Sequence, residues 1–126
     1  RWINQDVFHF LRAAEKSETE YDLIILDPPS FTKVKGGLSD ALRGYRELHV
    51  RAFKLLSKEG LLATFSCSHH VSESAFVQTV ADALVDARRS ARKIGRFSQP
   101  SDHPVVPTLP ETEYLKGFLF EMMPGR

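Results

Sequence analysis

Hydrophobic positions recur along the chain with two different spacings. Where they recur every three or four residues, the sequence predicts helices, over residues 7–14, 39–56 and 72–89. Where they run continuously or alternate with polar residues, it predicts strands, over 21–26, 61–67, 92–97 and 115–122. Asp6 and Ser72 precede the first and third helices as N-caps, and Gly60 is expected to close the second helix.

The order of these elements predicts the fold class. Strands alternate with helices, which is typical of an α/β domain with a mainly parallel sheet. The strand YDLIIL, Tyr21 to Leu26, contains four consecutive aliphatic residues and is expected to be buried on both faces. The chain has 126 residues and 42% hydrophobic content, which suits one domain with its own core.

Composition narrows the function classes. No apolar run approaches the roughly 18 residues that a membrane span needs, and the first residues do not resemble a signal peptide, so we expect a cytoplasmic protein with no membrane partner. The single cysteine, Cys67, excludes an internal disulfide framework and a cysteine-rich zinc site. No metal is therefore expected.

The net charge of +1 is small, but the basic residues gather in two clusters. The first cluster contains Lys33, Lys35, Arg43, Arg46 and Arg51, and the second contains Arg88, Arg89, Arg92, Lys93 and Arg96. Such runs are common on solvated helix faces. The alternative interpretation is that they contact phosphates around a nucleic-acid site.

Residues with reactive side chains stand at the ends of two predicted strands. Asp27 follows Leu26 and begins Asp-Pro-Pro, and Cys67 ends the strand over 61–67. The carboxyl ends of neighbouring parallel strands meet at a ligand crevice, so the two are candidates for one site. Each also has a structural interpretation, because aspartate is a common turn residue and a lone cysteine is often a small core residue.

Four segments carry a family likeness: RWINQDVFHFLR, YDLIILDPPSF, GYRELHVRAFKLLSKEGLLATFSCS and DHPVVPTLPETEYLKGF. In this order they resemble the C-terminal half of S-adenosylmethionine (SAM)-dependent RNA methyltransferases. The group they resemble most is the 23S ribosomal RNA cytosine-5 methyltransferases with an N-terminal PUA domain. The resemblance implies a Rossmann-like methyltransferase fold in which residues 1–126 form the C-terminal portion and the last strand is antiparallel.

The resemblance also implies roles for individual residues. SAM is the implied cofactor and RNA, specifically 23S ribosomal RNA, the implied substrate. Cys67 matches the nucleophile in TFSCS, and Asp27 opens the target-base loop. The implied substrate contacts are Pro28, Pro29, Ser30, Phe31, Lys33 and Lys35, and the implied cofactor contacts are Asp6, Asp27 and Pro28. Phe31 is expected either to stack on the base or to pack under the loop.

Cytosine chemistry explains why a thiol and an acid are needed together. Carbon 5 is a poor nucleophile, and addition of a thiolate to carbon 6 makes it enamine-like. Asp27 would bond the ring nitrogen and exocyclic amine, while the prolines fix the loop. The proton acceptor stays open between His69, His70 and other groups. Some RNA cytosine-5 methyltransferases carry a second cysteine where Ser30 and Phe31 stand, so the likeness is to the single-cysteine branch.

Three alternatives remain open from the sequence. An amine or guanine nucleic-acid methyltransferase would want an aromatic residue directly after the prolines, where Ser30 intervenes. A thiol hydrolase using Cys67 with His69 or His70 lacks an obvious orienting acid. The third is a domain without activity of its own, because the sequence has no glycine-rich cofactor turn. Such a domain is expected to bind SAM weakly and to self-associate as a homo-oligomer through an exposed sheet edge.

Overall fold

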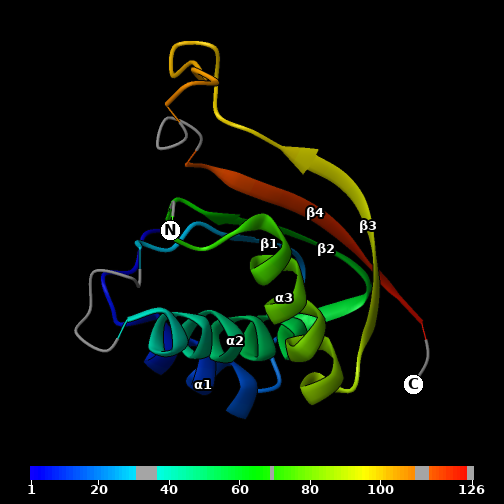
Figure 1. Cartoon of the computed structure of the whole chain (residues 1–126). Coiled ribbons are helices and arrows are strands. Elements are labelled where there is room, and N and C mark those ends of the chain that lie inside the picture. The colour runs from blue at the N-terminus through cyan, green and yellow to red at the C-terminus, as the bar shows by residue number, and fades with distance from the viewer. Residues whose placement is uncertain (31–36, 69, 110–113, 125–126) are drawn as a thin grey trace.

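The computed structural model describes residues 1–30, 37–68, 70–109 and 114–124. In chain order the elements are α1 (Val7–Lys16), β1 (Tyr21–Leu26), α2 (Gly37–Leu55), β2 (Leu56–Ser66), α3 (Glu73–Ala87), β3 (Ser90–Phe97) and β4 (Lys116–Met123) (Figure 1). Each of the seven predicted helices and strands is therefore present. The main difference is that β2 begins five residues earlier than predicted.

The strands form one four-stranded sheet in the order β1-β2-β4-β3. β1 and β2 are parallel, with Leu26 opposite Thr64 at the end of the ladder. β4 is antiparallel to both of its neighbours. Three of the four strands consequently run in one direction and the last strand runs against them. This confirms the predicted α/β class and the antiparallel last strand.

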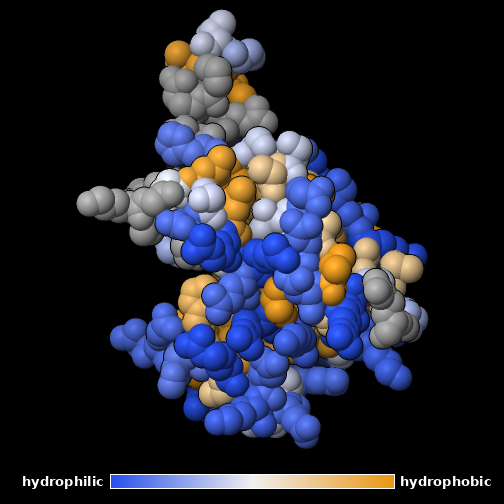
Figure 2. Space-filling model, turned by 60° about the horizontal axis from the view of Figure 1, so that its bottom comes forward, coloured by the Kyte–Doolittle hydropathy of each residue, from blue (hydrophilic) through white to orange (hydrophobic). Residues whose placement is uncertain are grey.

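The described helices all lie against one face of the sheet (Figure 1). The aromatic side chains of Tyr45, Phe53, Phe76 and Phe118 are fully buried between the helices and the strands. Viewed from the helix side, the outer surface is mainly hydrophilic with scattered apolar spots (Figure 2). Among the described residues, no helix combines the length and apolar character that crossing a bilayer requires.

The expectation that β1 is buried on both faces is wrong. Leu26 points to the helices and is 6% exposed, whereas Leu23 and Ile25 are 53% and 63% exposed. Successive side chains of a strand point to opposite faces, and no described element covers the second face of the sheet at β1. We call this surface the open face. On the same face, Ala63 pairs with Ile25 and is itself buried, and Leu119 pairs with Ala63.

Two of the three predicted helix caps are present in the structure. Asp6 accepts a hydrogen bond from the His9 amide at 3.0 Å, and Ser72 accepts one from the Ala75 amide at 3.1 Å, so both predicted N-caps are confirmed. Gly60 does not close α2, because the chain enters β2 at Leu56. The end of this helix is completed by a distant side chain.

That side chain is Arg89, which comes from the second basic cluster. Its guanidinium donates to the carbonyl oxygens of Phe53 and Leu56 at 2.7 and 2.8 Å. A third bond reaches the carbonyl of Ser57 at 3.0 Å. The last carbonyls of a helix lack partners within the helix, and a planar guanidinium offers several donors at once. Arg89 therefore takes the place of the predicted glycine cap.

Candidate functional site at the carboxyl ends of two parallel strands

Asp27 and Cys67 are each the first residue after one of two adjacent parallel strands. Continuing the register of Leu26 with Thr64 sets Asp27 level with Phe65, two residues before Cys67. With ordinary strand spacings the two Cα atoms then lie roughly 8 Å apart. Asp27 is exposed and Cys67 is half-buried. A carboxylate and a thiol thus occupy the same edge of the sheet within reach of solvent.

The neighbours of Cys67 determine the face to which it belongs. Ser66 is fully buried and Ser68 is 2% exposed, while Cys67 between them is half-buried. The Ser66 hydroxyl lies 3.2 Å from the hydroxyl of Tyr45 on α2, so Ser66 points to the helices. Alternation along the chain directs Cys67 away from the core. The sulfur is therefore not enclosed in packed hydrocarbon.

A second polar contact joins α2 to β2 one helical turn further along. His49 is fully buried, and its Nδ1 lies 2.6 Å from the carbonyl oxygen of Tyr45. A carbonyl can only accept, so Nδ1 carries the proton and Nε2 accepts from the Thr64 hydroxyl, also at 2.6 Å. Burial lowers the pKa of His49 to about 4, against the raising effect of its bond to Tyr45. The imidazole is neutral at pH 7.

The spacing of these contacts fits helix and strand geometry. Tyr45 and His49 are four residues apart on the helix, about 6 Å along its axis. Their partners Ser66 and Thr64 are two residues apart on the strand, between 6 and 7 Å by ordinary strand rise, or about the same length. Both bonds therefore form together and fix α2 along the part of β2 that leads to Cys67.

The remaining predicted site residues are only partly described. Asp6 is exposed, and its carboxylate caps α1. Pro28 and Ser30 are half-buried and Pro29 is exposed. Outside the described residues lie Phe31, Lys33, Lys35 and His69. The roles assigned to all of these residues remain predictions.

Most arginines of the basic clusters have structural partners. In the first cluster Arg43, Arg46 and Arg51 pair with Asp40, Asp86 and Glu15. In the second cluster Arg92 and Arg96 pair with Glu121 and Glu73, and Lys93 Nζ lies 5.1 Å from the centre of the Phe118 ring. Hydrogen bonds from Arg46 and Arg51 lower the pKa of Asp86 and Glu15 respectively. These pairs favour the interpretation of the two basic clusters as parts of a solvated surface over the interpretation as phosphate contacts.

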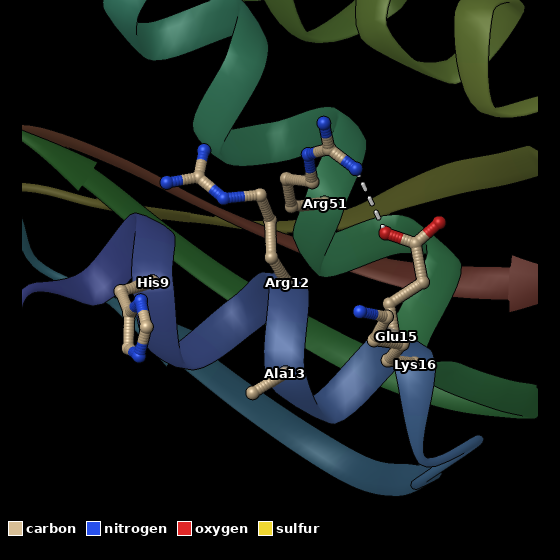
Figure 3. A pocket seen from close by; sticks show the side chains of 6 residues that line it. All are labelled: His9, Arg12, Ala13, Glu15, Lys16 and Arg51. Carbon is tan, nitrogen blue, oxygen red and sulfur yellow. Dashed lines mark hydrogen bonds and ion pairs between the residues drawn. The ribbon is translucent and has the colours of Figure 1, made fainter.

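A hollow of about 580 Å³ lies between α1 and α2, away from Asp27 and Cys67 (Figure 3). Its lining residues are His9, Arg12, Ala13, Glu15, Lys16 and Arg51. Arg51 and Glu15 close one side of it with an ion pair of 2.9 Å. Charged side chains form most of the lining, and none of the predicted site residues contributes to it. The hollow is a groove between two helices.

Sequence reasoning missed three residues that support this edge: Tyr45, His49 and Lys116. Tyr45 and His49 lie on the buried face of α2, where the periodicity shows a core position but not the polar partner across it. Lys116 falls within the predicted last strand, and the structure shows it only 9% exposed. The sequence signal that could have found Lys116 is a lysine beside a run of buried aromatic and aliphatic positions.

Comparison with known proteins places this geometry in context. No family model matches the sequence. A methyltransferase solved in complex with SAH has a TM-score of 0.78 and 26% identity, over 93% of this chain and 30% of its own. The fold is that of the SAM-dependent methyltransferases. A SAM-dependent methyltransferase from Streptococcus mutans also gives a TM-score of 0.78 and 26% identity, over 93% of this chain and 29% of its own.

A curated ribosomal RNA methyltransferase is also similar to this chain in sequence. The ribosomal RNA large subunit methyltransferase I of Salmonella arizonae is 43% identical over 122 residues, which cover 97% of this chain. The match covers 30% of that relative. The chain thus spans just under a third of the length of the curated relatives it matches. The predicted methyltransferase fold is confirmed.

Proposed function

We propose that this chain is the C-terminal portion of a SAM-dependent methyltransferase domain that methylates carbon 5 of a cytosine in ribosomal RNA through an adduct with its single thiol, Cys67. The observation that carries the proposal is the placement of Asp27 and Cys67 at the carboxyl ends of adjacent parallel strands. The 43% identity with a ribosomal RNA methyltransferase supports RNA as the substrate. By resemblance the RNA is 23S ribosomal RNA, methylated in the cytoplasm by a protein with an N-terminal PUA domain.

Asp27 and Pro28 at this edge, together with Asp6 at the start of α1, have the chemistry of one side of a SAM site. Asp6 and Asp27 present exposed carboxylates that can accept hydrogen bonds from an amine or hydroxyl group, and Pro28 follows directly with a half-buried ring. We assign these three residues to the cofactor. When bound, SAM supplies an electrophilic methyl group. By resemblance, the glycine-rich turn and the acid that holds the ribose belong to the N-terminal half of such a domain.

Within this proposal, Cys67 and Asp27 act on the cytosine itself. The Cys67 thiolate forms a bond to carbon 6 and moves electron density onto carbon 5. Asp27 shares a proton with the ring nitrogen, which neutralises the charge of the adduct, and accepts a hydrogen bond from the exocyclic amine. Once carbon 5 carries the methyl group, a base removes its proton. The electrons of that C–H bond restore the ring double bond and expel the sulfur. Pro28, Pro29, Ser30, Phe31, Lys33 and Lys35 are assigned to substrate binding.

The decisive test is Cys67→Ala in the full-length protein. Loss of a covalent nucleophile should reduce methylation of 23S ribosomal RNA at least about 1000-fold. Asp27→Asn, which keeps the shape but loses the charge, should reduce the rate about 100-fold. Methylation that survives in the Cys67→Ala protein would remove the thiol adduct and favour the amine or guanine alternative.

The chain by itself is proposed to be inactive. It contains no glycine-rich cofactor turn, so it provides only part of the cofactor pocket. Titration calorimetry of the 126-residue chain with SAM should give weak binding or none. Micromolar affinity would show that the chain holds the cofactor without further residues and would contradict this part of the proposal.

A further inference from the structure

Lys116 is a buried lysine at the carboxyl edge of the sheet. It begins β4, is 9% exposed, and pairs in register with Ser66. Among the described residues, no other lysine, and no arginine, aspartate or glutamate, is buried. Burying an ammonium group is unfavourable unless hydrogen bonds replace its water. The partners of Lys116 therefore indicate why a lysine stands here.

The Lys116 ammonium bonds the backbone on the far side of Cys67. Its Nζ donates to the carbonyl oxygen of Ser68 at 2.5 Å and to that of Tyr114 at 3.1 Å. Ser68 immediately follows Cys67 and is 2% exposed. The same carbonyl accepts a longer bond from the Val71 amide, at 3.4 Å, so Lys116 provides its shorter and charged hydrogen bond.

A hydrophobic residue would continue the pattern of the strand better than lysine does. Phe118, Phe120 and Met122 occupy the alternate positions that follow Lys116, and all three are buried against the helices. The aliphatic stem of Lys116 extends this row, and its ammonium group ends at the Ser68 carbonyl. The ammonium group thus bonds the segment around Cys67 and not the core.

Cys67 is consequently held from both sides. Before it, the Ser66 hydroxyl contacts the hydroxyl of Tyr45. After it, the Ser68 carbonyl accepts from Lys116. One anchor comes from α2 and the other from β4, so two elements fix the backbone on either side of a residue that is itself half-buried.

We propose that Lys116 is a positioning residue for Cys67: its ammonium fixes the Cys67–Ser68 segment and so orients the thiol. The anchoring rests on contacts within this chain, and its effect on methyl transfer rests on the function proposed above. The two are tested separately below.

The first test uses the 126-residue chain and the fact that Cys67 is its single cysteine, so alkylation reports this residue alone. Lys116→Met keeps the length of the side chain and removes the donor. Release of the segment should expose the thiol and raise the rate of iodoacetamide alkylation roughly tenfold, as expected for loss of a charged hydrogen bond. Hydrogen exchange in the peptide containing residues 66–71 should rise in parallel.

Lys93→Met is the matched control. Lys93 lies on the neighbouring strand β3 and its ammonium contacts the Phe118 ring, so its loss should leave the alkylation rate unchanged. Circular dichroism checks that each variant is folded. If Lys116→Met does not fold, the shorter neutral Lys116→Gln serves in its place. Wild-type alkylation and exchange in a folded Lys116 variant would overturn the proposal.

The second test uses the full-length protein and 23S ribosomal RNA. A misplaced thiol should lower kcat about tenfold and leave KM for RNA unchanged, because the substrate contacts are intact. An increase in KM with unchanged kcat would overturn the positioning role. If Cys67→Ala proves active, the proposed function fails, but alkylation and exchange in the chain still decide whether Lys116 anchors the segment.

Discussion

His49 shows how one buried side chain makes stability depend on pH. The imidazole is fully buried between Tyr45 and Thr64, and both of its nitrogens are hydrogen-bonded in the neutral form. Burial lowers its pKa from 6.5 to about 4. Between these two values the unfolded chain binds more protons than the folded chain. The contribution of neutral His49 to the free energy of unfolding is therefore fully present above pH 6.5 and is lost as the pH falls toward 4.

This gives a prediction for His49→Gln. The wild-type chain should lose about 3 kcal/mol of unfolding free energy between pH 6.5 and pH 4 from this residue alone. Glutamine can also donate to the Tyr45 carbonyl and accept from Thr64, but it does not titrate, so the variant should lack this part of the loss. Urea unfolding of both proteins at several pH values measures this difference. His9→Gln, at an exposed position of α1, should keep the wild-type slope.

At the scale of elements, Arg89 connects the start of β3 to the end of α2. Arg89→Met removes three hydrogen bonds from a charged donor to backbone carbonyls and should destabilise the chain by about 2 kcal/mol. Arg88→Met, at the exposed neighbouring residue, should change stability by less than about 0.5 kcal/mol. Thermal unfolding of both variants provides the comparison. Equal losses of stability in the two variants would show that the Arg89 hydrogen bonds make no specific contribution to stability.

The packing of β4 against β2 depends on a glycine. A Cβ on Gly117 would come within 2.5 Å of the Phe65 ring, which itself lies 5.5 Å from the Phe97 ring. Gly117→Ala should therefore displace this ring and cost about 1 to 3 kcal/mol. In a Phe65→Ala background the same change should cost less, since the clashing Cδ1 and Cε1 atoms are gone. Equal costs in both backgrounds, measured by urea unfolding, would rule out this contact as the reason for glycine.

The elements illustrate what the sequence could predict. N-caps at Asp6 and Ser72 were predictable because the cap and its partner lie three residues apart. The cap of α2 was not, because its donor lies more than thirty residues away at Arg89. The same holds for Lys116, whose carbonyl partner Ser68 is 48 residues distant. Asp27 and Cys67 were found because each directly follows a strand that the hydrophobic pattern reveals.

The open face of the sheet could not be predicted from the hydrophobic pattern. Leu23 and Ile25 have the composition of a buried strand, but their exposure depends on what covers the sheet. β1 is also an edge strand of the described sheet. Apolar side chains next to an edge with free backbone groups favour strand pairing between molecules.

We therefore predict that the 126-residue chain self-associates through β1, with a second copy as the partner. Leu23→Lys combined with Ile25→Lys should give a monomer of 14.3 kDa in light scattering, while the wild-type chain gives a larger mass. Val85→Lys, at an equally exposed apolar position on α3, should associate like the wild type. A monomeric wild-type chain would contradict the prediction.

The paired contacts of Tyr45 with Ser66 and of His49 with Thr64 also limit how the length of this protein can vary. Deleting one residue between Tyr45 and His49 would turn one of them about 100° around the helix relative to the other, so both partners could not be reached together. Insertions and deletions should therefore be excluded from this turn of α2. Length variation among homologues should collect in loops outside this turn.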